Sequence, residues 1–269
     1  ERGVWLKAPV VIIGLGELGQ VLATGFLKMG HPVFPLNRGA SVTELSTLAV
    51  EPFLIVVAVG EKDLDGILMT LPDAFKNRVL LLQNNLLRPD WQKHQILSPT
   101  ILVAWLDKKP GRPSVSVLPN KVFGPYCDEV AQALNALHIE TYSCPIEDMD
   151  RAMVAKNLYI HTINIAGLRV AGTVGELWKH HRALAEGIMK EILQIQCCRL
   201  GSPLDEALII QDTLRGFAGD WNHICMGRSA PQRLANALKF ADGFHLDTPI
   251  LREIALEIGL SGQGSDASE

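Results

Sequence analysis

The sequence predicts an α/β protein, in which an N-terminal Rossmann domain with a doubly wound sheet precedes an all-α C-terminal domain. In the first half, short runs rich in Val, Ile and Leu alternate with helical patterns, as expected for parallel strands that are buried on both faces. From about Cys144 onward strand signals disappear and long helical stretches follow. A glycine-rich loop also stands between the first expected strand and the first expected helix.

The elements of the first half follow from their periodicity. Strands are expected at residues 10–13, 33–36, 53–59, 79–83 and 101–105. Leu18, Leu22, Phe26 and Met29 recur at three- and four-residue steps, which predicts the first helix, and Gly30 supplies its stop. This order of strands and helices predicts the doubly wound sheet.

The end of the first domain and the second domain are less regular. Residues 115–118 and 121–123, separated by Pro119-Asn120, predict a hairpin-like pair before a helix over 127–137. Pro145 suits a domain hinge. Further helices are expected at 149–171, 177–200, 204–217 and 233–244. We therefore expect a Rossmann domain over 1–145, a helical domain over 146–260 and a disordered tail over 261–269.

Composition excludes several classes of protein. With 48% apolar and 20% charged residues in 269, the chain has ordinary globular composition and can bury a sizeable core. The net charge of −4 gives no general attraction to nucleic acid. No apolar run approaches the roughly 20 residues of a membrane-spanning helix. Five scattered cysteines without a C-x-x-C pair favour a reducing cytoplasm over a disulfide framework or a zinc site.

The loop between the first strand and the first helix reads Gly14-Leu15-Gly16-Glu17-Leu18-Gly19. A G-x-G-x-x-G string alone is weak, but a strand before it and a helix after it are the context that dinucleotide binding requires. The first glycine allows the tight turn, the second lets the backbone approach a pyrophosphate, and the third permits close packing of helix on strand. The amides at the start of the helix then face the anion. The alternative is a tight turn that binds nothing.

The end of the second strand selects the nucleotide. A domain that prefers NAD usually ends this strand in a carboxylate, but here it ends in Leu36-Asn37-Arg38. No carboxylate repels a 2′-phosphate, and Arg38 can pair with one through charge-assisted hydrogen bonds. NADP(H) is therefore the expected cofactor, unless Arg38 is only a solvated loop cation.

These motifs, with three others, resemble the ketopantoate reductase family, which belongs to the 6-phosphogluconate dehydrogenase-like superfamily. Leu82-Gln83-Asn84-Asn85 is similar to the family's strand-end Q-N-G, with Asn85 in place of glycine. The segment from Ala155 to Asn164, with Gly175-Glu176-Leu177 after it, is similar to the first helix of the family's second domain, and residues 246–249 to the segment before its last helix. The resemblance implies an NADPH-dependent reduction of a 2-oxo acid to a 2-hydroxy acid.

The resemblance also assigns roles. Hydride transfer to a ketone leaves negative charge on oxygen, so a donor must stand beside the carbonyl. We expect Lys156 to be the general acid, and Asn84 and Asn164 to orient substrate or nicotinamide; Asn164 lies about 12 Å along the helix from Lys156. The alternative is a structural role: Lys156 would be a surface cation, and the two asparagines would cap helices or form buried hydrogen bonds. The expected cofactor contacts are Gly14, Leu15, Gly16, Glu17, Leu18, Gly19, Asn37, Arg38, Val59, Gly60 and Asn84.

The chain also departs from the family. Ile160 stands where the family has a substrate-contacting asparagine, and Gly219 and Pro231 fall where it has a serine and a glutamate. Gly60 replaces a lysine of many relatives, and the segment from Ala40 to Pro52 is short. Activity and the identity of the acid are therefore not fixed by the sequence.

Two other functions stay open. One is an NADP-dependent 3-hydroxyacid dehydrogenase-like enzyme, which also uses a lysine of its second domain. The other is a non-catalytic NADPH-binding sensor or scaffold protein that has lost its substrate contacts. We expect a small 2-oxo or 2-hydroxy acid between the domains, no nucleic acid, no membrane and no metal, since His161, His180 and His181 lack a common direction and a third ligand. A homodimer is left open.

Overall fold

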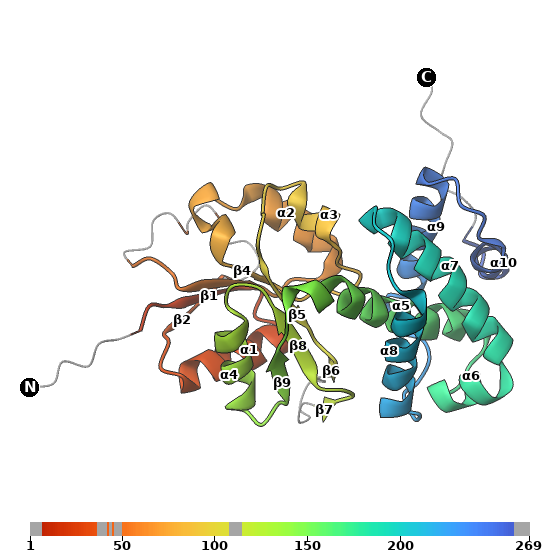
Figure 1. Ribbon diagram of the computed structural model, residues 1–269, viewed down its shortest axis with the longest axis horizontal. Coiled ribbons are helices and arrows are strands. Elements are labelled where there is room, and N and C mark those ends of the chain that lie inside the picture. The colour runs from red at the N-terminus through yellow and green to blue at the C-terminus, as the bar shows by residue number, and fades with distance from the viewer. Residues whose placement is uncertain (1–6, 37–41, 43–44, 46–49, 108–114, 261–269) are drawn as a thin grey trace, which may run out of the picture. The chain divides into compact units, whose positions relative to one another are not determined.

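The structure, a computed structural model, describes residues 7–36, 42, 45, 50–107 and 115–260 (Figure 1). The chain forms two compact units, Glu1–Met153 and Val154–Glu269. The first unit holds β1 (Val10–Ile13), α1 (Glu17–Lys28), β2 (Val33–Leu36), β3 (Leu54–Val57), α2 (Glu61–Thr70), the 3-10 helix η2 (Asp73–Arg78), β4 (Val79–Leu81), α3 (Arg88–Gln92), β5 (Thr100–Val103), β6 (Leu106–Asp107), β7 (Val115–Ser116), β8 (Asn120–Phe123), α4 (Cys127–Asn135), β9 (Thr141–Ser143) and η3 (Ile146–Asp148).

The sheet of the first unit has the order β2-β1-β3-β4-β5-β8-β9. The strands from β2 to β5 are parallel, β8 runs antiparallel to β5, and β9 is parallel to β8. Helices α1 and α4 cover one face of the sheet, and α2 and α3 cover the other (Figure 1). The predicted doubly wound α/β domain is therefore confirmed.

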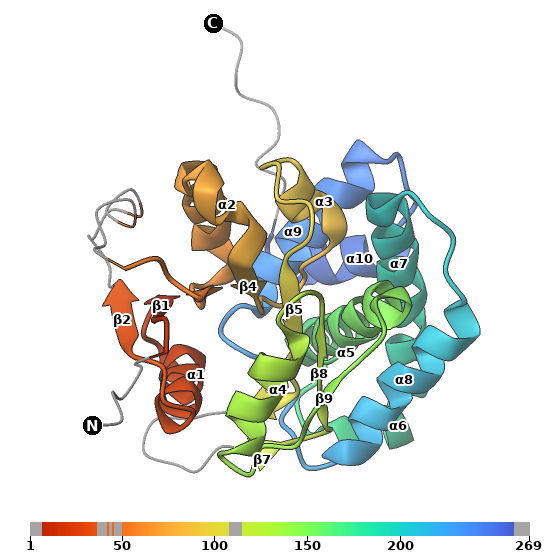
Figure 2. The ribbon, with the colours of Figure 1, turned by 60° about the vertical axis from the view of Figure 1, so that its left-hand side comes forward.

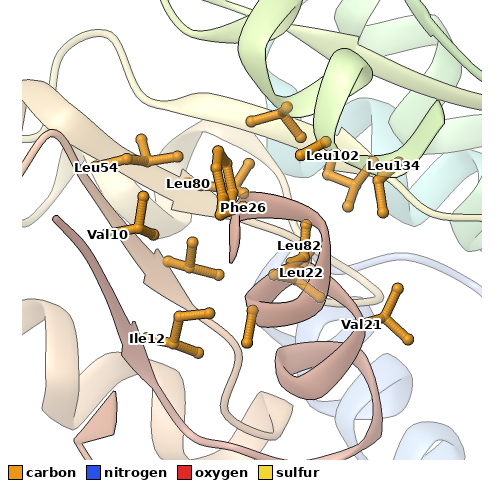
Figure 3. Close-up of a cluster of buried hydrophobic side chains, with 14 of the residues drawn as sticks. Val10, Ile12, Val21, Leu22, Phe26, Leu54, Leu80, Leu82, Leu102 and Leu134 are labelled. Atoms are coloured by element: carbon orange, nitrogen blue, oxygen red, sulfur yellow. The ribbon is translucent and has the colours of Figure 1, made fainter. Parts of the chain in front are cut away.

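The core of this unit lies between the sheet and helices α1 and α4. It is made by inward side chains of the strands, such as Val10 and Leu54, and of the helices, such as Phe26 and Leu134, all almost fully buried (Figure 3). Gly25 lets the two helices touch, because a Cβ atom there would lie 2.5 Å from the carbonyl oxygen of Ala133. Burial on both faces explains why β1, β3 and β4 read as unbroken apolar runs.

The predicted hairpin of residues 115–118 and 121–123 is wrong. Strand β7 pairs instead with β6, while β8 fills the sheet edge next to β5. Asn120 supplies the physical reason. Its buried side chain accepts a hydrogen bond from the Trp105 amide (2.8 Å) and donates one to the Glu140 carbonyl (3.0 Å), which fixes the start of β8 to the ends of two other segments.

Strand β9 was not predicted. It has only three residues, and Tyr142 and Ser143 in it are exposed, so no apolar run marks it. Helix α4 runs across β8 and β9 (Figure 2) and is tied to β9 through Asn135, whose side chain bonds the backbone of Thr141 in both directions. The strand forms because its neighbours position it.

Helices make up the regular structure of the second unit in the part that the structure describes, apart from one isolated bridge between Thr173 and Ile224. It holds the later turns of α5 (Met149–Arg169), together with α6 (Val174–His180), α7 (Arg182–Leu200), α8 (Glu206–Gly219), α9 (Ala230–Gly243) and α10 (Pro249–Glu257). The predicted all-α second domain is confirmed. Among the described residues, no helix is both long and apolar enough to cross a bilayer. All five cysteines are free thiols.

The helix predicted over 177–200 is two helices. Thr173 caps α6 by accepting a hydrogen bond from the Glu176 amide (3.2 Å), while the Glu176 carboxylate accepts one from the Thr173 amide (2.8 Å). At His181 the backbone leaves the helical region, and α7 begins at the next residue. Neither glycine nor proline marks this break, so the sequence pattern runs through it.

Candidate functional site

The glycine loop joins β1 directly to α1. Gly14 has a φ of +89°, in the left-handed region that favours glycine. Gly16 occupies the N-cap of α1, where no side chain caps the helix. The first amides of α1 therefore face outward without a side-chain acceptor, which is the arrangement that binds an anion.

The three glycines of the loop have different surroundings. A Cβ atom on Gly14 would lie 2.9 Å from the Ala58 carbonyl oxygen, and one on Gly19 only 2.2 Å from the carbonyl oxygen of Gly14. These two positions are therefore closed to any side chain by the backbone packing of strand, loop and helix. In contrast, a Cβ atom on Gly16 would meet no atom of the described residues within 4 Å. Within the described part of the chain the space beside Gly16 is open, which would let a phosphate approach the backbone.

A second helix start lies beside the first. Gly60 is the N-cap of α2, again without a side-chain cap, and it follows β3, the parallel neighbour of β1. The chain leaves β1 for β2 on one side and returns to β3 on the other, so the carboxyl ends of β1 and β3 form the topological switch point of the sheet. Ligands of open α/β sheets bind at this point. The structure brings Val59 and Gly60 to the same edge as the glycine loop.

Gln83, whose role the sequence did not indicate, links the ends of two neighbouring strands at this edge of the sheet. Its side-chain amide donates to the carbonyl oxygens of Val57 (2.7 Å) and Val59 (3.2 Å), and its oxygen accepts from the Leu82 amide (3.1 Å). One side chain thus joins the end of β4 to the end of β3. The motif around residues 82–85 indicated that this turn is special, but not that its glutamine fixes the neighbouring strand.

Asn84 and Asn85 form the turn that follows β4. Asn85 has a φ of 61°, so it adopts the left-handed conformation that a glycine would adopt there. Asparagine is among the residues that tolerate this conformation best. The apparent departure at Asn85 therefore preserves the backbone path of the turn. Asn84 is half-buried and lies beyond the end of β4, next along the same edge of the sheet.

The two residues expected to select NADP(H) cannot be placed in the same way. Asn37 and Arg38 lie outside the described residues. Strand β2 ends at Leu36, whose carbonyl oxygen accepts a hydrogen bond from the Gly14 amide (3.0 Å).

Lys156, Ile160 and Asn164 lie at steps of four residues on α5 and so share one side of that helix. Between residues 152 and 167, every residue of α5 is buried except Lys156 and Ile160, which are half-buried. Asn164 is buried, with 6% of its surface exposed. Ile160 presents no hydrogen-bonding group on this side of the helix, as its position in the sequence implied.

Arg233, which the sequence did not single out, contacts Asn164. It lies in the first turn of α9, where its own amide bonds the Ser229 carbonyl oxygen (2.9 Å), and its guanidinium donates to Oδ1 of Asn164 (3.0 Å). The two residues are 69 positions apart. No local pattern could have revealed the pair.

Gly219 and Pro231 carry no polar side chain, as the sequence shows. Gly219 is the last residue of α8, and Pro231 lies in the first turn of α9, which contains no acidic residue. Arg233 contributes a guanidinium to this turn, near the position where the resemblance would place a carboxylate.

Together, the topological switch point of the sheet, the glycine loop and the helical second unit define a protein of the two-domain Rossmann class. No protein-family model matches the chain, and no curated protein matches its sequence. Solved structures match it over nearly its whole length.

The particular structures it resembles are reductases and dehydrogenases. The 2-dehydropantoate 2-reductase of Methylococcus capsulatus matches with a TM-score of 0.66 at 15% identity, covering 94% of this chain and 96% of that one. The enzyme of the same name from Geobacter metallireducens gives 0.65 at 15%, covering 94% and 100%. D-mandelate dehydrogenase, solved with NADH, gives 0.66 at 13%, covering 94% and 98%. These structures confirm, for the fold, the predicted resemblance to ketopantoate reductases.

Proposed function

We propose that this chain is an NADPH-dependent oxidoreductase that reduces a small 2-oxo acid to the 2-hydroxy acid. The observation that carries the proposal is the open, uncapped backbone at the switch point, where Gly16 and Gly60 start two helices side by side at the ends of β1 and β3. A dinucleotide at this loop is supported by the close packing at Gly14 and Gly19 and by the free space that the described residues leave at Gly16. NADPH bound there supplies the hydride.

The chain's own residues supply binding and proton transfer. The amides at the start of α1 bind the pyrophosphate, and Arg38 binds the 2′-phosphate. Lys156 donates a proton to the oxygen that becomes negative as the carbonyl is reduced. Asn84 and Asn164 donate hydrogen bonds that orient the reacting groups. The class of substrate is supported by D-mandelate dehydrogenase, which matches with a TM-score of 0.63 at 13% identity and whose ternary structure contains NADH and anilino(oxo)acetate.

The first test is cofactor titration followed by NADPH oxidation with a panel of 2-oxo acids, including pyruvate, 2-oxoisovalerate, ketopantoate and phenylglyoxylate. Lys156→Ala should lower kcat by about 10² to 10⁴ while leaving the Kd for NADPH within about threefold, because proton transfer is lost and cofactor binding is not. Lys179→Ala, at an exposed lysine of α6, is the matched control and should retain wild-type kcat. Tight NADPH binding without oxidation by any acid would instead identify the non-catalytic NADPH-binding protein.

A second test concerns the nucleotide. Arg38→Ala should weaken NADPH by about 10- to 100-fold, the loss of a charge-assisted contact worth roughly 1.5 to 3 kcal/mol, and should leave NADH nearly unchanged. Fluorescence titration with both nucleotides measures this. Equal losses for the two nucleotides would show that Arg38 does not read the 2′-phosphate.

A further inference from the structure

Asn164 is the one predicted substrate contact whose side-chain amide has a charged partner. The guanidinium of Arg233 donates to Oδ1 at 3.0 Å, and Asn164 retains only 6% of its surface exposed. A guanidinium has five donors and no acceptor. The group of Asn164 that faces Arg233 must therefore be its carbonyl oxygen, and its NH₂ group must face the other way.

The backbone around Asn164 reinforces this arrangement. A Cβ atom on Gly227 would lie 3.1 Å from Oδ1 of Asn164, a tight contact, so a side chain at this position would crowd the Asn164 amide. The same segment is fixed to α5 by the Met226 amide, which bonds the Ile163 carbonyl oxygen (3.2 Å). Gly167 makes room for it, because a Cβ atom there would lie 2.5 Å from the Met226 nitrogen.

Met226 itself is held in an unfavourable conformation. Its φ is 90°, in the left-handed region that non-glycine residues rarely adopt, although its side chain is more than half exposed. Such backbone strain persists where the surroundings over-determine it, and it gathers at functional sites. Here it brings Gly227 and the first turn of α9 against the part of α5 that carries Asn164.

We propose that Arg233 is a positioning residue, which fixes the amide of Asn164 so that its NH₂ group donates to an oxygen of the bound 2-oxo acid. This inference rests on the proposed function and deepens it. The substrate oxygen on this side must accept a hydrogen bond, which a carboxylate does well. The positive charge of Arg233 and the start of α9, whose first turn has no acidic residue, favour an anion there.

The test is calorimetric titration of the NADPH-loaded protein with oxamate and its N-phenyl derivative, two 2-oxo carboxylate mimics of different size. Arg233→Met removes the donor to Asn164 and should weaken both mimics at least tenfold. Arg233→Gln and Arg233→Lys keep a donor, without and with the charge, and should restore a clear part of the affinity. Arg228→Met, at an exposed arginine of the same segment, should bind as wild type does.

Asn164→Asp separates positioning from a purely structural role. The aspartate keeps the size of the side chain and pairs with Arg233 more strongly, but it has no NH₂ group to donate. We expect a folded variant with an unchanged Kd for NADPH and with binding of both mimics reduced at least 30-fold. A structural role alone would leave binding intact in this variant, and that result would overturn the proposal.

Other results of the binding titrations would also overturn the proposal. If Arg233→Met binds the mimics as tightly as wild type, or if Arg233→Gln is as weak as Arg233→Met, orientation of the amide is not what Arg233 supplies. Failure of the NADPH-loaded wild type to bind either mimic overturns the inference as well. The proposed function is judged separately, by NADPH oxidation and by its dependence on Lys156, so the two failures are distinguishable.

Discussion

At the scale of single residues, Gly16 is the residue of the glycine loop at which the proposed binding of NADPH can be tested most directly. A methyl group fits there without contact to the described residues, since none of their atoms lies within 4 Å of its position, and the φ of −77° suits any residue. We therefore expect a methyl group at this position to obstruct the proposed nucleotide rather than the fold. Gly14 and Gly19 differ, because a side chain at either would collide with backbone atoms.

Gly16→Ala should therefore lower NADPH affinity at least tenfold and change the free energy of unfolding by less than about 0.5 kcal/mol, as surface substitutions usually do. Fluorescence titration and urea unfolding measure the two effects. Gly66→Ala is the control, since its Cβ atom also meets nothing within 4 Å but lies inside α2. That variant should gain roughly 0.5–1 kcal/mol and bind NADPH normally. Wild-type affinity in Gly16→Ala would contradict the location of the pyrophosphate.

Residue by residue, the sequence predicted what depends on near neighbours in the chain. The glycine loop and the first helix follow from local sequence, and the structure has them. Gln83, Arg233 and the Arg88–Asp150 pair escaped prediction because each acts on a segment distant in sequence. The hairpin over 115–123 was wrong for a related reason, since a sheet edge next to β5 competes with a local turn for β8.

At the scale of elements, α5 begins with a buried charge. Asp150 in its first turn has 4% of its surface exposed, and it forms a two-pronged ion pair with Arg88 at the start of α3, with an Nε to Oδ1 distance of 2.7 Å. Acidic residues are favoured in the first turn of a helix, but no local pattern in the sequence indicates Arg88 as the partner of Asp150. The pair also fastens α3, which follows the Asn84 turn, to the first turn of α5.

Arg88→Met should cost about 1–3 kcal/mol of unfolding free energy, because it leaves the buried Asp150 carboxylate without its cation. The value is below that for a fully buried pair, since half of the Arg88 side chain is exposed and screened. Urea unfolding at pH 7 measures it. In the control, Arg252→Met breaks an exposed pair with Asp242 and should change stability by less than about 0.5 kcal/mol. Equal effects of the two substitutions would show that the Asp150 pair has no special role.

At the scale of the whole molecule, we expect the stability of the first unit to depend on NADPH and that of the second unit to depend on pH. The described residues that we expect to contact NADPH all lie in the first unit, so NADPH should stabilise that unit, by about 2.7 kcal/mol at 100 times the Kd. The second unit contains a buried titratable group, His161, whose Nδ1 lies 2.8 Å from the Asn157 carbonyl oxygen and therefore donates to it. Burial, helped by the nearby positive charges of Arg233 and Arg199, lowers the pKa of His161 to about 4, although the hydrogen bond to Asn157 acts in the opposite direction.

Acid should consequently destabilise the protein through His161. In the unfolded chain its pKa returns to about 6.5, so above that pH both states are neutral and the full stability is present. As the pH falls from about 6.5 to about 4, His161 binds a proton in the unfolded state but not in the folded state, and the free energy of unfolding falls by up to about 3 kcal/mol. Urea unfolding between pH 7 and pH 4.5 should show a decrease about 2 kcal/mol smaller in His161→Gln than in wild type. His180→Gln, at an exposed histidine, should keep the wild-type profile. If His161→Gln also shows the wild-type pH dependence of the free energy of unfolding, His161 is not the group that links folding of the second unit to pH.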